Sequence, residues 1–154
     1  MDGIKKLLAV CMCFTLGGCS RSLSPHAENG TAAVISENLF SDQKEDVAEY
    51  LLTYQHLPFC YMTKTEARKH GWSGGALNQI VPDKAIGGDV YGNYEEILPK
   101  IKGKYYECDI DTLTEKSRGA KRIIYDDDTK DIDIYYTEDH YATFTLLYGD
   151  GEYE

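Results

Sequence analysis

The stretch KYYECDI at residues 104–110 decides the fold class of this chain. Apolar and polar side chains alternate along this stretch, as they do in a strand with one buried face. Three more stretches show this alternation: RIIY at 122–125, IDIYY at 132–136 and YATFTL at 141–146. The three aspartates at 126–128 are typical of a solvated turn. A run of strands with short connections predicts an antiparallel sheet in the C-terminal half.

The helical patterns all precede these strands. Apolar residues recur at helical intervals between Val47 and Tyr54, and Asp42 and Glu45 have capping-box spacing just before them. We expect this helix to end before Pro58, because proline cannot continue a helix.

A second helix is predicted from Thr63, which has capping-box spacing to Glu66, as far as Gly71. A third, shorter helical piece is expected at 76–80. The fold class predicted is α+β, with N-terminal helices packed on a C-terminal antiparallel sheet. We expect this domain to span residues 42–147.

The N-terminus resembles a bacterial lipoprotein signal peptide at residues 1–18. Lys5 and Lys6 form a charged start, and residues 7–16 are apolar but too few to cross a bilayer as a helix. Small residues precede Cys19, which favours cleavage there and lipidation of Cys19. The protein would then be secreted and anchored to the outer face of the bacterial cell membrane. The alternative is an ordinary secretory signal in which Cys19 is incidental.

The length and composition of the rest of the chain fit one small domain with a flexible segment on each side. The chain has 154 residues, and we expect a flexible tether at 19–41 and an acidic tail at 148–154. The formal charge of −10 argues against a general nucleic-acid binder. A local basic cluster can still hold a phosphate, because net charge mainly affects solubility and encounter rate.

Cys60 and Cys108 are the two cysteines of the predicted domain. In an exported protein they can pair and stabilise the fold. The alternative is two buried free thiols. Sequence spacing does not decide between the two, because it gives no distance.

One group of residues in the strand region has the composition of an acid–base site. Glu107 lies on a predicted strand, Arg118 and Arg122 are four residues apart, and His140 precedes the last predicted strand. A carboxylate, an imidazole and nearby cations can catalyse proton transfer at a phosphodiester. The same residue types also form ordinary surface ion-pair networks, so spacing alone leaves both readings open.

A longer pattern resembles the barnase-like guanyl-specific microbial ribonucleases. The similarity covers about a hundred residues in order. It rests on VAEYLLTYQHLP at 47–58, YMTKTEA at 61–67, PDKAIGGD at 82–89, YECDI at 106–110, and DHYATFT at 139–145.

The resemblance implies an endoribonuclease that cleaves single-stranded RNA preferentially after guanosine, with no metal or cofactor. It implies that Glu107 is the general base and His140 the general acid. Lys64, Arg118 and Arg122 would surround the scissile phosphate. It also implies RNA as substrate and a barstar-like protein inhibitor as a partner, and we expect a monomer.

For the base, the resemblance implies that Glu95 accepts hydrogen bonds from the Watson–Crick edge of guanine. Backbone groups around Tyr91 to Asn93 would read the other edge, with Tyr141 packed nearby. Tyr94 stands where barnase has an arginine. We expect this change to weaken the attraction for RNA and to remove a contact for the inhibitor. An aromatic ring at Tyr94 can instead stack on a base.

Two other functions remain open at this point. One is a catalytically weak or inactive module that binds RNA or protein on the ribonuclease scaffold, which Tyr94 and the acidic balance favour. The other is an antibacterial ribonuclease toxin with a dedicated immunity partner.

Overall fold

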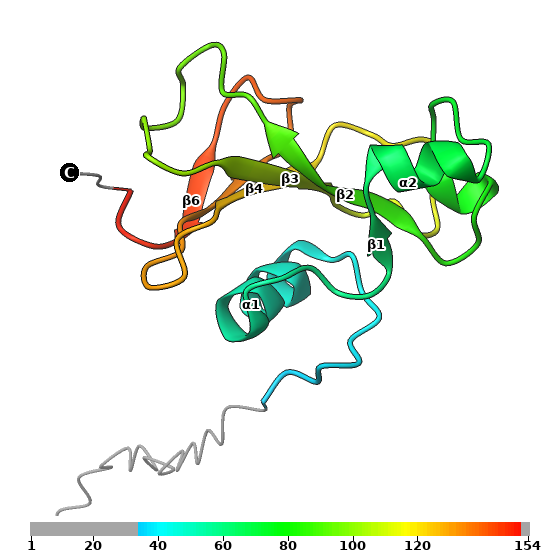
Figure 1. The fold of residues 1–154 in the computed structure, drawn as a ribbon, viewed down its shortest axis with the longest axis horizontal. Helices are drawn as coiled ribbons and strands as arrows, with labels where there is room; N and C mark the ends of the chain where they lie inside the picture. Colours follow the sequence, from blue (N-terminus) through cyan, green and yellow to red (C-terminus); the bar gives the residue numbers. More distant parts are fainter. Residues whose placement is uncertain (1–33, 152–154) are drawn as a thin grey trace, which may run out of the picture. The chain divides into compact units, whose positions relative to one another are not determined.

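A computed structural model describes residues 34–151. The elements in chain order, shown in Figure 1, are α1 (Lys44–Tyr54), β1 (Tyr61–Met62), α2 (Lys64–Lys69), the 3-10 helix η1 (Leu77–Gln79), β2 (Ala85–Tyr91), β3 (Tyr105–Asp109), β4 (Arg122–Asp126), β5 (Ile134–Thr137) and β6 (Thr145–Tyr148). Within the described residues the strands form one sheet in chain order. β1 pairs in parallel with β2, and all other neighbours are antiparallel. The predicted α+β class is confirmed.

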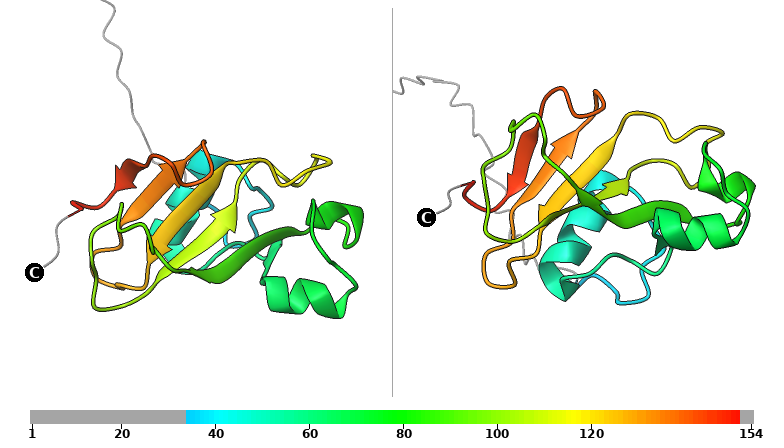
Figure 2. Two further views of the ribbon diagram at one scale, coloured as in Figure 1. Left: turned by 90° about the horizontal axis from the view of Figure 1, so that it is seen from above. Right: turned by 45° about the horizontal axis from the view of Figure 1, so that its top comes forward.

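Helix α1 covers one face of the sheet, as the views in Figure 2 show. Its buried side chains are Val47, Ala48, Tyr50 and Leu51. The main core joins three of them to apolar side chains of β3, β4 and β5, which are Cys108, Ile123, Tyr125 and Ile134. Burial of this apolar area contributes roughly 25 cal/mol per Å² to folding.

The opposite face of the sheet carries a smaller core and the acidic residues Glu107 and Asp109. Leu98, Tyr105, Ile124 and Tyr135 form that second cluster. Side chains alternate along a strand, so Glu107 and Asp109 share the face of Tyr105 on β3. Tyr106 and Cys108 point toward α1.

A β-bulge in β2 places an acid beside Glu107. Gly87 pairs with Cys108, but the next registered pair is Asp89 with Glu107, so Gly88 is the extra residue. Gly88 has a φ of 89°, which a side chain disfavours. At Gly87 a Cβ would approach Tyr61 and Cys108 at 2.6 and 2.7 Å. This pair of glycines therefore permits both the tight sheet packing and the bulge.

Two features of the first helix differ from the sequence predictions. The N-cap is Gln43, and its side chain makes no capping bond. Asp42 instead accepts hydrogen bonds from the backbone N–H groups of Thr112 and Leu113. The predicted capping box at Asp42 is therefore wrong, because a tertiary contact takes this carboxylate. The box at Thr63 is confirmed.

The folded part also begins before the predicted boundary at residue 42. The hydroxyl of Tyr50 donates to the carbonyl of Glu37 at 2.9 Å, and that of Tyr54 to the carbonyl of Ile35 at 2.7 Å. Residues 35–41 therefore belong to the domain rather than to a tether. The proposed signal peptide and Cys19 lie outside the described residues.

The strands match the predictions except in three places. β1 and β2 were not predicted, and the last strand begins at Thr145 rather than at Tyr141. The reason for the later start is a turn at 138–144, described below. Among residues 34–151, no helix is long and apolar enough to cross a membrane.

Candidate active site

Glu107 is a buried carboxylate held by two side chains from different elements. Only 6% of the residue is exposed. Lys64 Nζ lies 2.5 Å from Oε1, and the hydroxyl of Tyr141 donates to Oε2 at 2.7 Å. Both carboxylate oxygens are therefore bound, which fixes the orientation of the group. A buried carboxylate without such partners would be costly.

Local sequence explains why Lys64 reaches this position. Thr63 and Glu66 form a reciprocal capping box, so α2 begins at Lys64. The backbone N–H of Lys64 donates to Asp89 Oδ2 at 2.8 Å. Because Asp89 pairs with Glu107 across the bulge, α2 and β3 are tied together at the point where the ion pair forms.

Asp109 holds both predicted arginines. Arg118 binds it through two parallel hydrogen bonds of 2.7 Å, and Arg122 Nε lies 2.9 Å from Oδ1. The bidentate contact raises the pKa of Arg118. Arg122 is only 2% exposed, and it donates to three backbone carbonyls, those of Arg118, Gly119 and Lys121.

The two arginines therefore have different surroundings. Arg118 is partly exposed and retains guanidinium N–H groups that Asp109 does not occupy. Arg122 lies behind the site, where it fixes the loop that carries Arg118. The structure thus brings both arginines to the sheet face of Glu107, but with Arg118 nearer to solvent.

His140 sits in a tight turn after β5. His140 and Tyr141 both have positive φ, at 58° and 72°, which is uncommon for residues with side chains. The Asp139 carboxylate stabilises the turn by accepting from Thr137 Oγ1 at 2.8 Å and from the hydroxyl and N–H of Thr143 at 2.6 and 2.9 Å. These bonds lower the pKa of Asp139 to about 2, with the Thr143 contacts contributing most.

This turn links the two predicted proton-transfer groups. The exposed His140 ring contacts the ring of Tyr141, with centroids 4.8 Å apart, and Tyr141 binds Glu107. Burial and the bond to Glu107 raise the pKa of Tyr141, so its phenol stays protonated and donates. A fixed carboxylate and an exposed imidazole can transfer protons during the cleavage of a phosphodiester. Nearby cations can stabilise the negative charge that develops on it.

A family model described as ribonuclease matches residues 41–148. The chain belongs to the ribonuclease family. It is accordingly an endoribonuclease, and RNA is its substrate.

Relatives of the ribonuclease come from several bacteria. A ribonuclease of Bacillus pumilus is 41% identical over 137 residues, which cover 82% of this chain and 80% of that protein. One from Heyndrickxia coagulans is 44% identical over 106 residues, covering 67% and 94%. The guanyl-specific ribonuclease Sa of Kitasatospora aureofaciens is 43% identical over 61 residues, covering 39% and 62%.

The loop after β2 carries the predicted base-binding residues of the ribonuclease. Asn93 closes it, because its side chain donates to the Leu98 carbonyl at 2.8 Å and accepts from the Leu98 N–H at 3.1 Å. Asn93 is therefore a structural residue of the loop, and Glu95 is exposed. Tyr94 is 91% exposed, and its ring lies where a side chain at Gly92 would be.

Tyr141 connects this loop to Glu107 and His140. Its ring stacks on Tyr91, the last residue of β2, with centroids 5.3 Å apart. Phe144 contacts Tyr91 edge-on at 6.1 Å. These contacts fix the phenol that binds Glu107 and leave it beside the start of the loop.

Cys60 and Cys108 form no disulfide in the ribonuclease, so of the two alternatives the free thiols are observed. Both are free and buried. Cys60 directly precedes β1, whereas Cys108 lies on β3, with β2 between these strands. Strands two places apart are separated by about 10 Å, which exceeds the Cα separation of a disulfide. Cys60 instead donates to the carbonyl of Ser41 at 3.4 Å.

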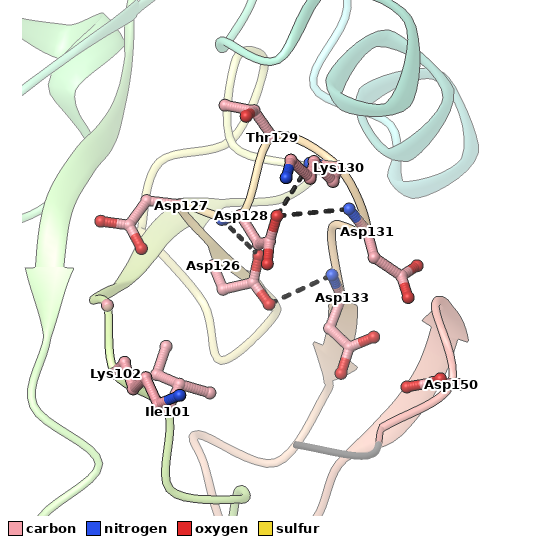
Figure 3. A pocket seen from close by; sticks show the side chains of 11 residues that line it. Ile101, Lys102, Asp126, Asp127, Asp128, Thr129, Lys130, Asp131, Asp133 and Asp150 are labelled. Atoms are coloured by element: carbon pink, nitrogen blue, oxygen red, sulfur yellow. Dashed lines mark hydrogen bonds between the residues drawn. The ribbon is translucent and has the colours of Figure 1, made fainter. Parts of the chain in front are cut away.

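A cavity of about 540 Å³ lies at the far end of β4 and is unrelated to this site (Figure 3). The aspartates that line it stabilise the turn between β4 and β5. Asp126 accepts from the N–H groups of Asp128 and Asp133, and Asp128 accepts from those of Lys130 and Asp131. Across residues 34–151, no three acidic, histidine or cysteine side chains are arranged to hold a metal ion.

Asp109 is a site residue that was not predicted from the sequence. One signal for it was available, since residues two apart on a strand share a face and Asp109 follows Glu107 by two. Asp139 was likewise unassigned, and its role depends on the turn that only the structure reveals.

Proposed function

We propose that this ribonuclease cleaves single-stranded RNA preferentially after guanosine, with no metal ion or other cofactor. The product of the first step is a 2',3'-cyclic phosphate, which is then hydrolysed. The observation that carries the proposal is the fixed Glu107 carboxylate, with Lys64 at 2.5 Å and Tyr141 at 2.7 Å. This arrangement favours catalysis over a module that only binds RNA or protein.

In the first step the nucleophile comes from the substrate itself. Glu107 accepts the proton of the 2'-hydroxyl, and the 2'-oxygen forms a bond to phosphorus. The bond from phosphorus to the 5'-oxygen breaks, and protonated His140 gives that oxygen its proton. Because RNA supplies the nucleophile, no metal-bound water is required.

In the second step the roles reverse. Neutral His140 takes a proton from water, which attacks the cyclic phosphate. Protonated Glu107 gives a proton to the departing 2'-oxygen. Each residue thus returns to its initial state.

Lys64 and Arg118 stabilise the negative charge that develops on the phosphoryl oxygens. Both are partly exposed and lie on the sheet face of Glu107. Arg122 does not contact the phosphate in this proposal, since its guanidinium is bound to Asp109 and to backbone carbonyls. We therefore assign Arg122 a positioning role and a contribution to the local positive field.

Guanine preference is proposed for the loop at 92–96. Glu95 is an exposed carboxylate that can accept hydrogen bonds from the Watson–Crick edge of guanine. Tyr94 supplies an exposed ring for stacking, worth about 1–3 kcal/mol in other single-strand complexes. One relative that shares 61 aligned residues with this chain is named guanyl-specific.

The test is cleavage of four dinucleoside monophosphates, GpA, ApA, CpA and UpA, by purified protein with excess chelator. We expect GpA to be cleaved fastest and guanosine 2',3'-cyclic phosphate to appear before the 3'-phosphate. Equal rates on all four would contradict the base preference. Activity that disappears with chelator and returns with a divalent ion would contradict the metal-free mechanism.

We also propose that the ribonuclease is a secreted monomer, lipidated at Cys19 and held at the outer face of the cell membrane. Cys19→Ser should move the protein from the membrane fraction to the medium. A barstar-like inhibitor is a proposed partner, and a neighbouring gene for a small acidic inhibitor would support a toxin role. With Tyr94 in place of arginine, we expect barstar itself to inhibit weakly.

A further inference from the structure

The loop at 110–121, between β3 and β4, carries Arg118, and few contacts hold its outer part. Residues 113–117 are mostly exposed to solvent. In the described part of the chain, these residues form hydrogen bonds outside the loop only with Asp42 and Asn78. A segment with so little buried surface opens easily unless its hydrogen bonds hold it. The position of Arg118 therefore depends on a small number of bonds.

Asn78 gives both of its amide N–H groups to this loop. Its Nδ2 lies 2.7 Å from the carbonyl oxygen of Leu113 and 3.0 Å from that of Glu115. An asparagine amide has two N–H donors, so one serves each carbonyl. Its Oδ1 accepts from the side chain of Gln79 at 3.1 Å, which agrees with this orientation of the amide. The two carbonyls lie five and three residues before Arg118.

The 3-10 helix η1, which presents Asn78, is anchored in the core. Leu77 of this helix is 2% exposed and packs with Trp72 and Ile86. The indole N–H of Trp72 donates to the carbonyl of Gly75 at 2.9 Å. Ile86 belongs to β2, which pairs with β3. Asn78 thus attaches the loop to a rigid part of the fold, and Figures 1 and 2 show the loop beside η1.

The side chain of Arg118 depends on the same part of the chain. Its guanidinium forms two hydrogen bonds of 2.7 Å with Asp109, and its guanidinium carbon lies 5.8 Å from the ring centroid of Trp72. Both contacts require the backbone of Arg118 to stay close to the sheet and to Trp72. The segment 72–78 therefore contacts the side chain through Trp72 and the preceding backbone through Asn78.

We propose that Asn78 is a positioning residue for RNA cleavage, which keeps the Arg118 guanidinium where negative charge develops on the scissile phosphate. This proposal rests on the proposed function, which gives Arg118 its contact with that phosphate. Asn78 itself touches no reacting atom. A displacement of about 1 Å in a positioned group can lower a rate by about 100-fold. Because Arg118 acts on charge that develops in the transition state, loss of Asn78 should affect kcat more than KM.

The test is a double-mutant cycle on GpA with Asn78→Leu, Arg118→Ala and the double variant. Asn78→Leu should lower kcat by about tenfold and change KM by less than about twofold. Arg118→Ala should lower kcat by about 100-fold, the usual loss for one donor to the transition state. The double variant should be no slower than Arg118→Ala, since Asn78 acts through Arg118. Asn78→Asp keeps the shape without the donors, and it should show the same loss if Asn78→Leu fails to fold.

Gln55→Leu is the matched control, because it also removes a side-chain amide that donates to a loop carbonyl. Its Nε2 donates to the carbonyl of Thr129 at 2.7 Å, in the turn between β4 and β5. Gln55→Leu should leave kcat and KM unchanged. The proposal would be overturned by wild-type rates in both Asn78 variants or by an equal loss in Gln55→Leu. A double variant whose loss is the product of the two single losses would also overturn it.

A second measurement does not require turnover. The Nε–H of Arg118 donates to Asp109, and its exchange with water can be followed by NMR. We expect this exchange to be about tenfold faster in Asn78→Leu and unchanged in Gln55→Leu. If the wild type cleaves no RNA, the proposed function fails. Faster exchange in Asn78→Leu would still support the positioning of Arg118 by Asn78, and equal exchange rates would refute it.

Discussion

The hydroxyl of Tyr141 donates a 2.7 Å hydrogen bond to Oε2 of Glu107. Tyr141 directly follows His140, so this bond joins the turn that carries the proposed acid to the strand that carries the proposed base. Lys64 holds the other carboxylate oxygen. The proposed acid–base pair is thus assembled from three segments, and a change in any of them should affect the chemistry.

Tyr141→Phe should lower kcat/KM on GpA by about 10- to 100-fold, because a hydrogen bond to a charged group contributes roughly 1.5–3 kcal/mol. The ring stack on Tyr91 is retained in this variant. Tyr106→Phe is the matched control, since Tyr106 lies on the other face of β3 and packs in the α1 core. Equal effects of the two substitutions on steady-state kinetics would refute the role of the hydroxyl.

Gly87→Ala should destabilise the fold by about 1–3 kcal/mol, the usual cost of overpacking. The new Cβ would lie within 3 Å of Tyr61, Leu57 and Cys108. Urea denaturation measures the change. In Gly119→Ala the Cβ meets no atom within 4 Å and only the positive φ of 55° is unfavourable. A smaller cost at Gly87 than at Gly119 would contradict the close-packing argument.

Asp139 should make stability depend on pH in the acid range. Its pKa in the folded state is lowered to about 2, from an ordinary value of 3.8. The stabilisation is therefore complete above about pH 4 and disappears as the pH falls through 2. The difference in Tm between wild type and Asp139→Asn should be constant from pH 7 to 4 and then shrink.

Asp131→Asn is the control for this experiment, because it removes an exposed aspartate from another turn. A Tm difference between wild type and Asp139→Asn that grows on acidification would have the wrong sign for a lowered pKa.

A reducing agent should leave the Tm unchanged, because Cys60 and Cys108 are free. Burial raises the pKa of Cys60 to about 11 and that of Cys108 well above its ordinary value. We therefore expect both thiols to react slowly with alkylating reagents in the folded protein and quickly in urea. A fall in Tm on adding dithiothreitol would indicate the disulfide instead.

The sequence predicted elements well where the signal is local. Thr63 and Glu66 lie within one turn, and their capping box forms as expected. Asp42 and Glu45 have the same spacing, but the Asp42 carboxylate binds the backbone at Thr112. The difference is a tertiary contact over 70 residues, which no local pattern contains.

The missed strand β2 has a physical explanation as well. Gly87 and Gly88 interrupt the alternation that identifies strands, because one makes room for close packing and the other forms the bulge. The predicted start of the last strand at Tyr141 was wrong for the opposite reason. The side chains there do alternate, but hydrogen bonds to Asp139 fold the segment into a turn.

For the candidate site, the sequence identified residues from their types and their places on single strands. It did not show which of these residues contact each other across strands. The sequence placed Glu107, His140 and the arginines in one group, and the resemblance added Lys64. It did not reveal that Asp109 binds both arginines or that Arg122 is buried. Those facts follow from the register of β3 with β4, where Asp109 and Arg122 are direct partners.

The most direct test of the central claim is the pH–rate profile of kcat/KM on GpA for the wild type, Glu107→Ala and His140→Ala. The wild type should give a bell, since the base must be ionised while the acid is protonated. Glu107→Ala should lose the acidic limb and His140→Ala the basic limb, each with a rate lower by about 10²–10⁴-fold. Wild-type rates in either variant, or both limbs intact in both, would contradict the assignment of Glu107 as base and His140 as acid.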